Sequence, residues 1–128
     1  MEAMPLYQNE FYHDGRGPEL HRVIWVQEGK VLKGFEYFNP DDEYKEENIK
    51  CLILDGVEVI LSAGEEVHGN ILSNRKSKSA IFKVFDSAWF KQFNPRHLDG
   101  CSHFQIMFYD EIYDIICRGV KFGRGRII

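Results

Sequence analysis

Two histidines and a cysteine near the carboxyl end of the chain have the side chains best suited to chemistry. His97, Cys101 and His103 form the pattern H-x3-C-x-H. Imidazole nitrogen and thiolate sulfur are ligands that zinc prefers in proteins. The pattern supplies only three donors, so Cys51 or Cys117 would have to complete a closed site, and the spacing fits no standard zinc template. We therefore expect no metal or cofactor. If a metal were bound, His97, Cys101 and His103 would be the candidate ligands.

The same three residues also suit nucleophilic catalysis. A cysteine nucleophile needs a base within hydrogen-bond reach and donors for the oxyanion, and either histidine would serve Cys101 as that base. Residues 99–102, however, predict a turn that enters a strand, without a strand–turn–helix arrangement. A small metal-dependent or hydrolytic enzyme centred on His97, Cys101 and His103 is therefore an alternative interpretation. In the other interpretation His97 packs beside a helix and His103 lies on a mixed strand face.

Carboxylates gather in two other places. Between residues 41 and 47 the chain carries five of them and one lysine. They belong to Asp41, Asp42, Glu43, Glu46 and Glu47. We predict that this segment binds a basic protein partner, because opposed charges accelerate association and add specificity; an ordinary solvated surface is the alternative. Asp110, Glu111 and Asp114 crowd the end of a predicted hairpin, where paired carboxylates would bind magnesium or exchange a proton, although a turn alone accounts for the first two.

Basic residues suggest a third kind of site. Arg75, Lys76 and Lys78 lie in a glycine-punctuated polar segment, and an edge for phosphates would also draw on Lys121, Arg124 and Arg126. Trp25, Tyr37 or Phe38 would then stack on bases. The formal net charge of −4 and the pI of about 5.7 argue against a nucleic-acid binder. Phosphate or nucleic-acid binding through the loop from Arg75 to Lys78 is the second alternative.

The elements that must position these residues centre on a hairpin. Residues 102–109 and 112–121 alternate in polarity and are joined by a tight turn at Asp110 and Glu111. Alternation places six large side chains on one apolar face: Phe104, Ile106, Phe108, Tyr113, Ile115 and Cys117. A two-residue loop pairs Phe108 with Tyr113, whereas a four-residue loop shifts the partners and keeps the face. The opposite face, with His103, Gln105 and Asp114, is mixed.

The rest of the chain reads as further strands. Residues 20–27 and 31–38 predict a strand pair, and Asp55-Gly56 between two apolar runs predicts a hairpin over residues 49–61. Residues 80–85 are a strand or the start of a helix. A short helix is predicted from Ser87 to Phe93, with Trp89 and Phe93 on one side, and one or two helical turns or a loop at residues 42–48.

The sum is an α+β fold of six to seven strands in antiparallel hairpins with one or two short helices. We expect one domain over residues 1–128, with an irregular lead-in at 1–18 and a flexible tail at 123–128. No apolar run reaches the ~18 residues needed to span a bilayer, the N-terminus lacks a signal pattern, and three cysteines without C-x-x-C spacing suit reduced thiols. We expect a cytoplasmic protein without a membrane partner.

The C-terminal quarter resembles small bacterial orphan domains of the immunity-protein type. The residues that carry the resemblance are Trp89, Phe93, His97, Leu98, Cys101, His103, Phe104, Phe108, Tyr109, Asp110, Asp114, Ile115, Ile116 and Cys117. The resemblance implies a non-enzymatic protein that neutralises a cognate, basic toxin domain by occlusion, and it transfers no catalytic residue. Protein binding is thus the function that the sequence favours, with nucleic acid an unfavoured partner.

Overall fold

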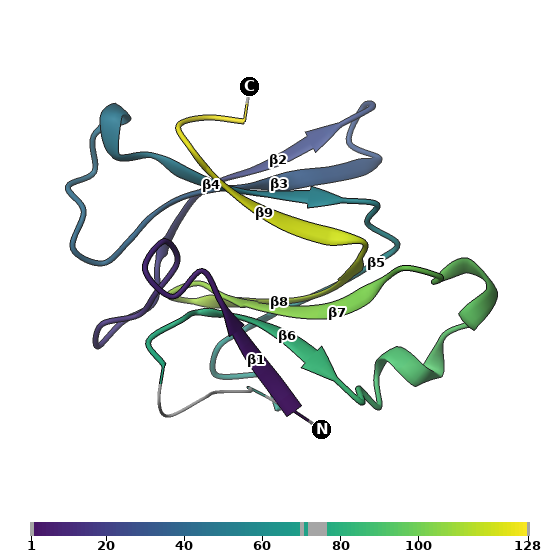
Figure 1. The fold of residues 1–128 in the computed structure, drawn as a ribbon. Coiled ribbons are helices and arrows are strands. Elements are labelled where there is room, and N and C mark those ends of the chain that lie inside the picture. The colour runs from purple at the N-terminus through teal and green to yellow at the C-terminus, as the bar shows by residue number, and fades with distance from the viewer. Residues whose placement is uncertain (1, 70, 72–76, 128) are drawn as a thin grey trace.

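A computed structural model describes residues 2–69, 71 and 77–127, and it contains two antiparallel β-sheets packed face to face (Figure 1). The five-stranded sheet has the order β1 (Glu2–Leu6), β6 (Ile81–Phe85), β7 (Ser102–Met107), β8 (Glu111–Cys117) and β5 (Val59–Gly64). The four-stranded sheet has the order β2 (Glu19–Val26), β3 (Val31–Phe38), β4 (Lys50–Asp55) and β9 (Gly119–Arg124).

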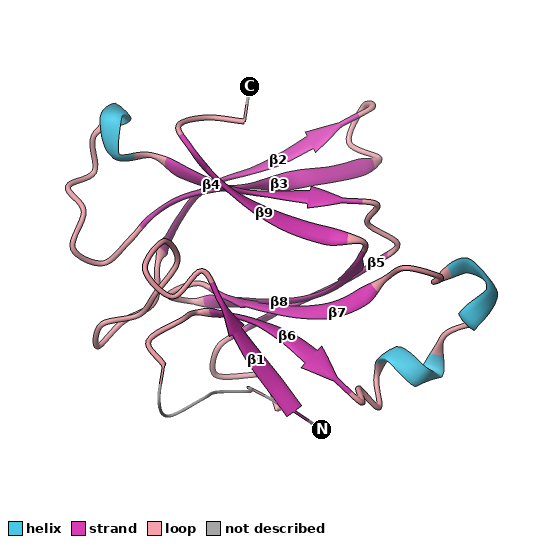
Figure 2. Cartoon of the chain, viewed as in Figure 1, coloured by secondary structure: helices cyan, strands magenta, loops and turns pink. Residues whose placement is uncertain are grey.

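Helical structure in the described residues is limited to three 3₁₀ turns (Figure 2): η1 (Glu46–Asn48), η2 (Phe90–Gln92) and η3 (Pro95–His97). The antiparallel, mainly β expectation is confirmed, whereas the α+β class is not. Trp89 and Phe93 do lie together, with ring centroids 5.4 Å apart. The helical turn ends at Gln92, because Phe93 is already extended. Asn94 is extended as well, as expected for a residue before proline.

The predicted apolar face of the hairpin is the part of the core that the five-stranded sheet contributes. Strands β7 and β8 pair Phe104 with Ile115 and Ile106 with Tyr113, which is the register of the longer loop. All six predicted side chains belong to the core cluster. Rings from both sheets meet there, since the centroid of Phe35 in β3 lies 5.1 Å from that of Phe108 and 4.7 Å from that of Tyr113.

The predicted hairpin over residues 49–61 is wrong. Strands β4 and β5 lie in different sheets, and each pairs with the chain segment that contains β8 and β9. The pairing continues through the corner, where Arg118 N donates to Asp55 O over 2.8 Å and Glu58 N to Ile116 O over 2.9 Å. Gly56 bends the chain with a φ of +61°, a region that glycine adopts without steric cost. The Asp-Gly pair therefore forms a corner between sheets, a known use of bends in β-sandwiches.

The other expected strands are present. Strands β2 and β3 pair as predicted, and residues 81–85 are strand β6, which resolves the ambiguity at 80–85 in favour of a strand. One face of the five-stranded sheet thus packs in the core, and its other face points away from the four-stranded sheet.

Both ends of the chain make contacts that the sequence did not predict. Strand β1 occupies part of the expected irregular lead-in and pairs with β6, and Phe11 in the following loop is fully buried. At the other end β9 pairs with β4. Beyond it, Arg126 binds Glu46 over 2.5 and 2.6 Å, and Ile127 N donates to Glu36 Oε2 over 2.9 Å.

Candidate functional site

Polar side chains interrupt the apolar pattern of β7 and β8 and lie together on the outer face of the five-stranded sheet. His103 and Gln105 alternate with core residues and therefore point away from the core. Gln105 is the cross-strand partner of Asp114, so all three side chains share one face. They are nevertheless buried, with exposed fractions of 6%, 1% and 5%. Residues 67–69 and 87–89 lie over them and line a shared cavity.

Asp114 is the centre of this cluster. Its Oδ1 lies 2.7 Å from His103 Nε2 and accepts a hydrogen bond from Gln105 Nε2 over 3.1 Å, while its Oδ2 lies 2.6 Å from His68 Nε2. Burial alone would raise the pKa of the Asp114 carboxyl, but hydrogen bonds from His103, His68 and Gln105 outweigh burial and lower that pKa. The carboxylate is therefore ionised near neutral pH. Because an ionised carboxylate only accepts hydrogen bonds, both histidines donate to it through Nε2.

The proton on Nε2 fixes the role of the other ring nitrogen of His103. In the neutral imidazole Nδ1 is then an acceptor, and it lies 2.8 Å from Ser87 Oγ. The Ser87 hydroxyl therefore donates to His103, and the tautomer follows from this network. The indole ring of Trp89 packs edge to face on the imidazole, with centroids 4.9 Å apart. Ser87, His103 and Asp114 thus form a continuous chain of hydrogen bonds.

Ser87 owes its position to the end of strand β6. Asp86 follows the strand with a φ of +53°, which is uncommon for a residue with a side chain and often occurs at functional sites. The turn directs Ser87 inward, where only 5% of the residue is exposed. Its Oγ also accepts a hydrogen bond from Phe90 N over 3.1 Å, in the manner of a helix cap. The Ser87 hydroxyl therefore holds the turn at Phe90 and also contacts His103.

The cluster borders a cavity of about 290 Å³. Its polar wall consists of His68, Ser87, His103, Gln105 and Asp114. Its apolar wall consists of Leu61, Ala63, Val67, Ala88 and Trp89. Leu61 and Val67 are 48% and 80% exposed, so the apolar wall continues to the surface. An uncharged ligand with a small apolar group fits these surroundings.

Of the residues predicted from H-x3-C-x-H, only His103 belongs to this cluster. His97 is exposed on η3, and Cys101 lies in the turn before β7. Among the residues that the structure describes, no group of three or more histidine, cysteine, aspartate or glutamate side chains is arranged to hold a metal ion. Sequence reasoning missed Ser87 and His68 as site residues. The only signal was the presence of polar residues in two otherwise apolar strands.

The environment of the three cysteines opposes thiolate chemistry. All three are free thiols, and burial raises the pKa of Cys101, of Cys51 and of Cys117, the last to about 12. Because the thiolate is the reactive form, we expect the folded protein at pH 7.5 to react with Ellman's reagent only at Cys101, at least about tenfold more slowly than a small free thiol. All three should react in denaturant. Rapid reaction of Cys101 would contradict this and revive it as a nucleophile.

The predicted acidic segment lies in the connection between β3 and β4, and most of its charges have partners. Asp42 binds Lys50 Nζ over 2.5 Å, and Asp41 accepts from Tyr12 Oη over 3.0 Å. Glu43 pairs with Lys45 over 2.7 Å and Glu46 with Arg126. Glu47 is exposed and forms no ion pair within residues 2–69, 71 and 77–127. Pairing reduces the net field that this segment presents to a partner.

The predicted basic loop falls partly outside the described residues, which include neither Arg75 nor Lys76. Lys78 binds Asp14 over 3.3 Å. Of the three rings proposed to stack on bases, Trp25 is 45% exposed, whereas Tyr37 and Phe38 are buried. A stacking platform therefore has one accessible ring of the three.

The three carboxylates predicted to lie together at the hairpin end, Asp110, Glu111 and Asp114, occupy two different places. Asp110 is exposed and Glu111 half-buried at the turn, where the Glu111 carboxylate accepts from Tyr113 Oη over 3.3 Å. Asp114 lies instead in the buried cluster with His68 and His103. Asp110 and Glu111 are thus turn residues, and only Asp114 belongs to the buried cluster.

Among the described residues, no helix has the length and apolar character needed to cross a membrane. No family model matches the sequence, and neither a curated protein nor a solved structure matches it.

Proposed function

We propose that the protein is a hydrolase that acts on small, uncharged esters with Ser87 as its nucleophile. The observation that carries the proposal is the pair of hydrogen bonds from Ser87 Oγ to His103 Nδ1, at 2.8 Å, and from His103 Nε2 to Asp114 Oδ1, at 2.7 Å. A serine, a histidine base and a buried carboxylate that orients the base are the parts of a serine-nucleophile site, which is recognised by geometry and roles. The apolar wall of the adjacent cavity supports an uncharged acyl group as the substrate.

In the proposed first step, Ser87 Oγ bonds to the carbonyl carbon of the ester while His103 Nδ1 takes the hydroxyl proton. Asp114 stabilises the resulting imidazolium through its hydrogen bond to Nε2. When the tetrahedral intermediate collapses, His103 returns the proton to the departing alcohol and the acyl group stays on Ser87. Water, deprotonated by His103, then releases the acid and restores the serine hydroxyl.

One feature of the site differs from the familiar serine-protease arrangement. There Nε2 of the histidine faces the serine, whereas here Nδ1 does. Either nitrogen of a neutral imidazole accepts a proton, so the exchange preserves the chemistry. The oxyanion would be bound by the backbone N–H of Ala88, the residue after the nucleophile, which forms no hydrogen bond in the described part of the chain.

The test is covalent capture of Ser87 by an organophosphorus reagent. Purified protein treated with diisopropyl fluorophosphate should gain one diisopropylphosphoryl group, located on Ser87 by peptide mass spectrometry, and should hydrolyse 4-nitrophenyl acetate. Ser87→Ala should abolish the labelling and lower the hydrolysis rate by at least about 10³-fold. Ser62→Ala, at an exposed position of strand β5, is the matched control and should leave both unchanged.

Ser87→Ala removes the cap on Phe90 N as well, which costs about 1 kcal/mol, so a thermal melt should verify that the variant is folded. Folded wild-type protein that remains unlabelled, or labelling that persists in Ser87→Ala, would refute the proposal. In that case the cluster serves to hold the covering segments on the sheet.

A second candidate function is binding of a basic protein partner, which is a toxin domain if the immunity-type resemblance holds. One observation favours it beyond the paired segment at residues 41–47. Glu65, Glu66 and Asp110 are exposed at one end of the five-stranded sheet and form no ion pair in the described part of the chain. Unpaired carboxylates present a stronger field to a basic partner than paired ones.

A further inference from the structure

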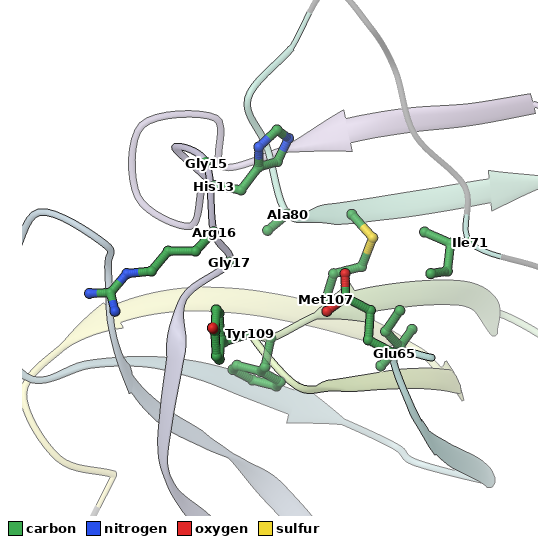
Figure 3. Close-up of a pocket in the computed structure, with 11 residues that line it drawn as sticks. His13, Gly15, Arg16, Gly17, Glu65, Ile71, Ala80, Met107 and Tyr109 are labelled. Carbon is green, nitrogen blue, oxygen red and sulfur yellow. The ribbon is translucent and has the colours of Figure 1, made fainter. Parts of the chain in front are cut away.

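A second cavity, of about 280 Å³, lies where β7 runs into its turn (Figure 3). Its walls include the apolar side chains of Ile71, Ala80, Met107, Phe108 and Ile112. Phe108, Ala80 and Ile112 are buried, while the ring of Tyr109 at the rim is 44% exposed. Drug-sized ligands occupy pockets of ~300–1,000 Å³, so this volume suits a single long side chain.

Among the described residues, the lining of this cavity contains one carboxylate, from Glu65, and two basic side chains, from His13 and Arg16. In Figure 3 the carboxylate of Glu65 points toward the side lined by Met107, whereas the guanidinium of Arg16 points away. Arg16 Nη2 instead donates to Pro40 O and to Tyr44 Oη, both over 3.2 Å. Arg16 therefore contributes to the wall without placing its charge in the cavity.

Further carboxylates lie on the segments next to Glu65, because the connection after β5 lies beside the turn between β7 and β8. Glu65 N donates to Asp110 O over 3.0 Å, and Gly64 is the cross-strand partner of Glu111. The carboxylates of Glu65, Glu66, Asp110 and Glu111 thus come from two adjoining segments. None of the four forms an ion pair in the described part of the chain, in contrast with Glu46 and its partner Arg126.

We infer that this cavity is the docking site for an arginine or lysine side chain on the surface of a basic protein partner. The inference rests on the second candidate function and is independent of catalysis by Ser87. The methylene stem of the incoming side chain packs on Met107, its cation pairs with Glu65, and its charge lies beside the ring of Tyr109. The carboxylates of Glu66, Asp110 and Glu111 on the adjoining segments attract the basic surface of the partner around that side chain.

The inference is tested with a blocked tripeptide, Ac-Gly-Arg-Gly-NH₂, titrated into the full ¹⁵N-labelled chain and followed through amide chemical shifts. Shifts are expected at Gly17, Met107 and Tyr109, which line the cavity. Glu65→Gln should weaken binding about fivefold, which is the upper range for an exposed ion pair. Glu47→Gln is the matched control and should leave the affinity unchanged, because Glu47 is exposed, belongs to the predicted acidic segment at residues 41–47 and forms no ion pair with the residues that the structure describes.

A second control is the neutral peptide Ac-Gly-Gln-Gly-NH₂, which should produce no saturable shifts. The inference is overturned if this peptide binds equally well, if Glu47→Gln weakens binding as much as Glu65→Gln, or if no amide at the cavity moves. Chemical-shift changes confined to residues 41–47 would refute docking at the cavity, although binding of a basic partner through the acidic segment would remain a candidate function. Ser87→Ala should bind the arginine peptide like the wild type, so failure of the hydrolase proposal would be seen separately.

Discussion

Asp114→Ala is expected to lower the free energy of unfolding by about 4 kcal/mol, because it removes the common acceptor of three buried donors. His103, His68 and Gln105 all donate to this carboxylate. A buried donor left without an acceptor costs about 1–3 kcal/mol, and loss of one partner from a buried charged pair costs about 3–5 kcal/mol. Urea denaturation near pH 7 measures the change. Asp99→Ala, in the exposed turn before Gly100, is the control and should cost less than about 0.5 kcal/mol.

The same carboxylate predicts how stability depends on pH. The pKa of Asp114 is lower in the folded chain than the ordinary value near 4, so the unfolded state binds more protons at acidic pH. The stabilisation is therefore complete above the unfolded pKa and is lost as the pH falls through the folded pKa. Wild-type protein should lose more stability than Asp114→Ala when the pH falls from about 5 to about 3. Parallel curves for the two proteins, or a loss below about 1 kcal/mol at pH 7, would contradict the assigned network.

Gly34→Ala is expected to destabilise the protein by at least about 3 kcal/mol. A Cβ at this position in β3 would lie 2.1 Å from the carbonyl oxygen of Leu52 and 2.9 Å from Ile127 Cδ1. The carbonyl belongs to the backbone of β4, which is held by pairing with β3 and β9. Overpacking of a core costs about 1–3 kcal/mol when side chains can move aside, and a paired backbone moves less readily.

The matched control for Gly34→Ala is Gly119→Ala. Gly119 begins β9, and a Cβ there would meet nothing within 4 Å. Its φ is not in the left-handed region, so the substitution should change stability by less than about 1 kcal/mol, and reduced freedom of the unfolded chain favours the alanine. Circular dichroism and urea midpoints compare the two variants. Equal midpoints would mean that β3 and β4 are not as close at Gly34 as the structure places them.

The parts of the fold that followed from the sequence depend on local patterns. Alternation of large apolar residues identified the inner face of β7 and β8, because side-chain direction in a strand has a period of two. The register of that hairpin depended on the length of the loop. A shift of two residues in register leaves the same side chains on the apolar face. The extended conformation of Asn94, the residue before Pro95, was equally local.

Longer-range pairing did not follow, and the Asp55-Gly56 segment illustrates why. An Asp-Gly pair between apolar runs favours a hairpin, but the runs on both sides are apolar on both faces, so either can pair with several partners. Strand β4 pairs instead with β9 and strand β5 with β8, partners that are far away along the chain. The left-handed glycine that suits a tight turn equally suits a corner.

The amino-acid order alone determined that the chain is built from antiparallel strands and which side of one hairpin is apolar, since both depend on residues close together in sequence. It also marked His103 and Asp114 as polar residues within apolar strands. Only the tertiary structure decided that Ser87, His68 and these two side chains meet, because they come from four separate segments. Burying a carboxylate is favourable only where donors surround it, and those donors are assembled by the packing of loops on the sheet.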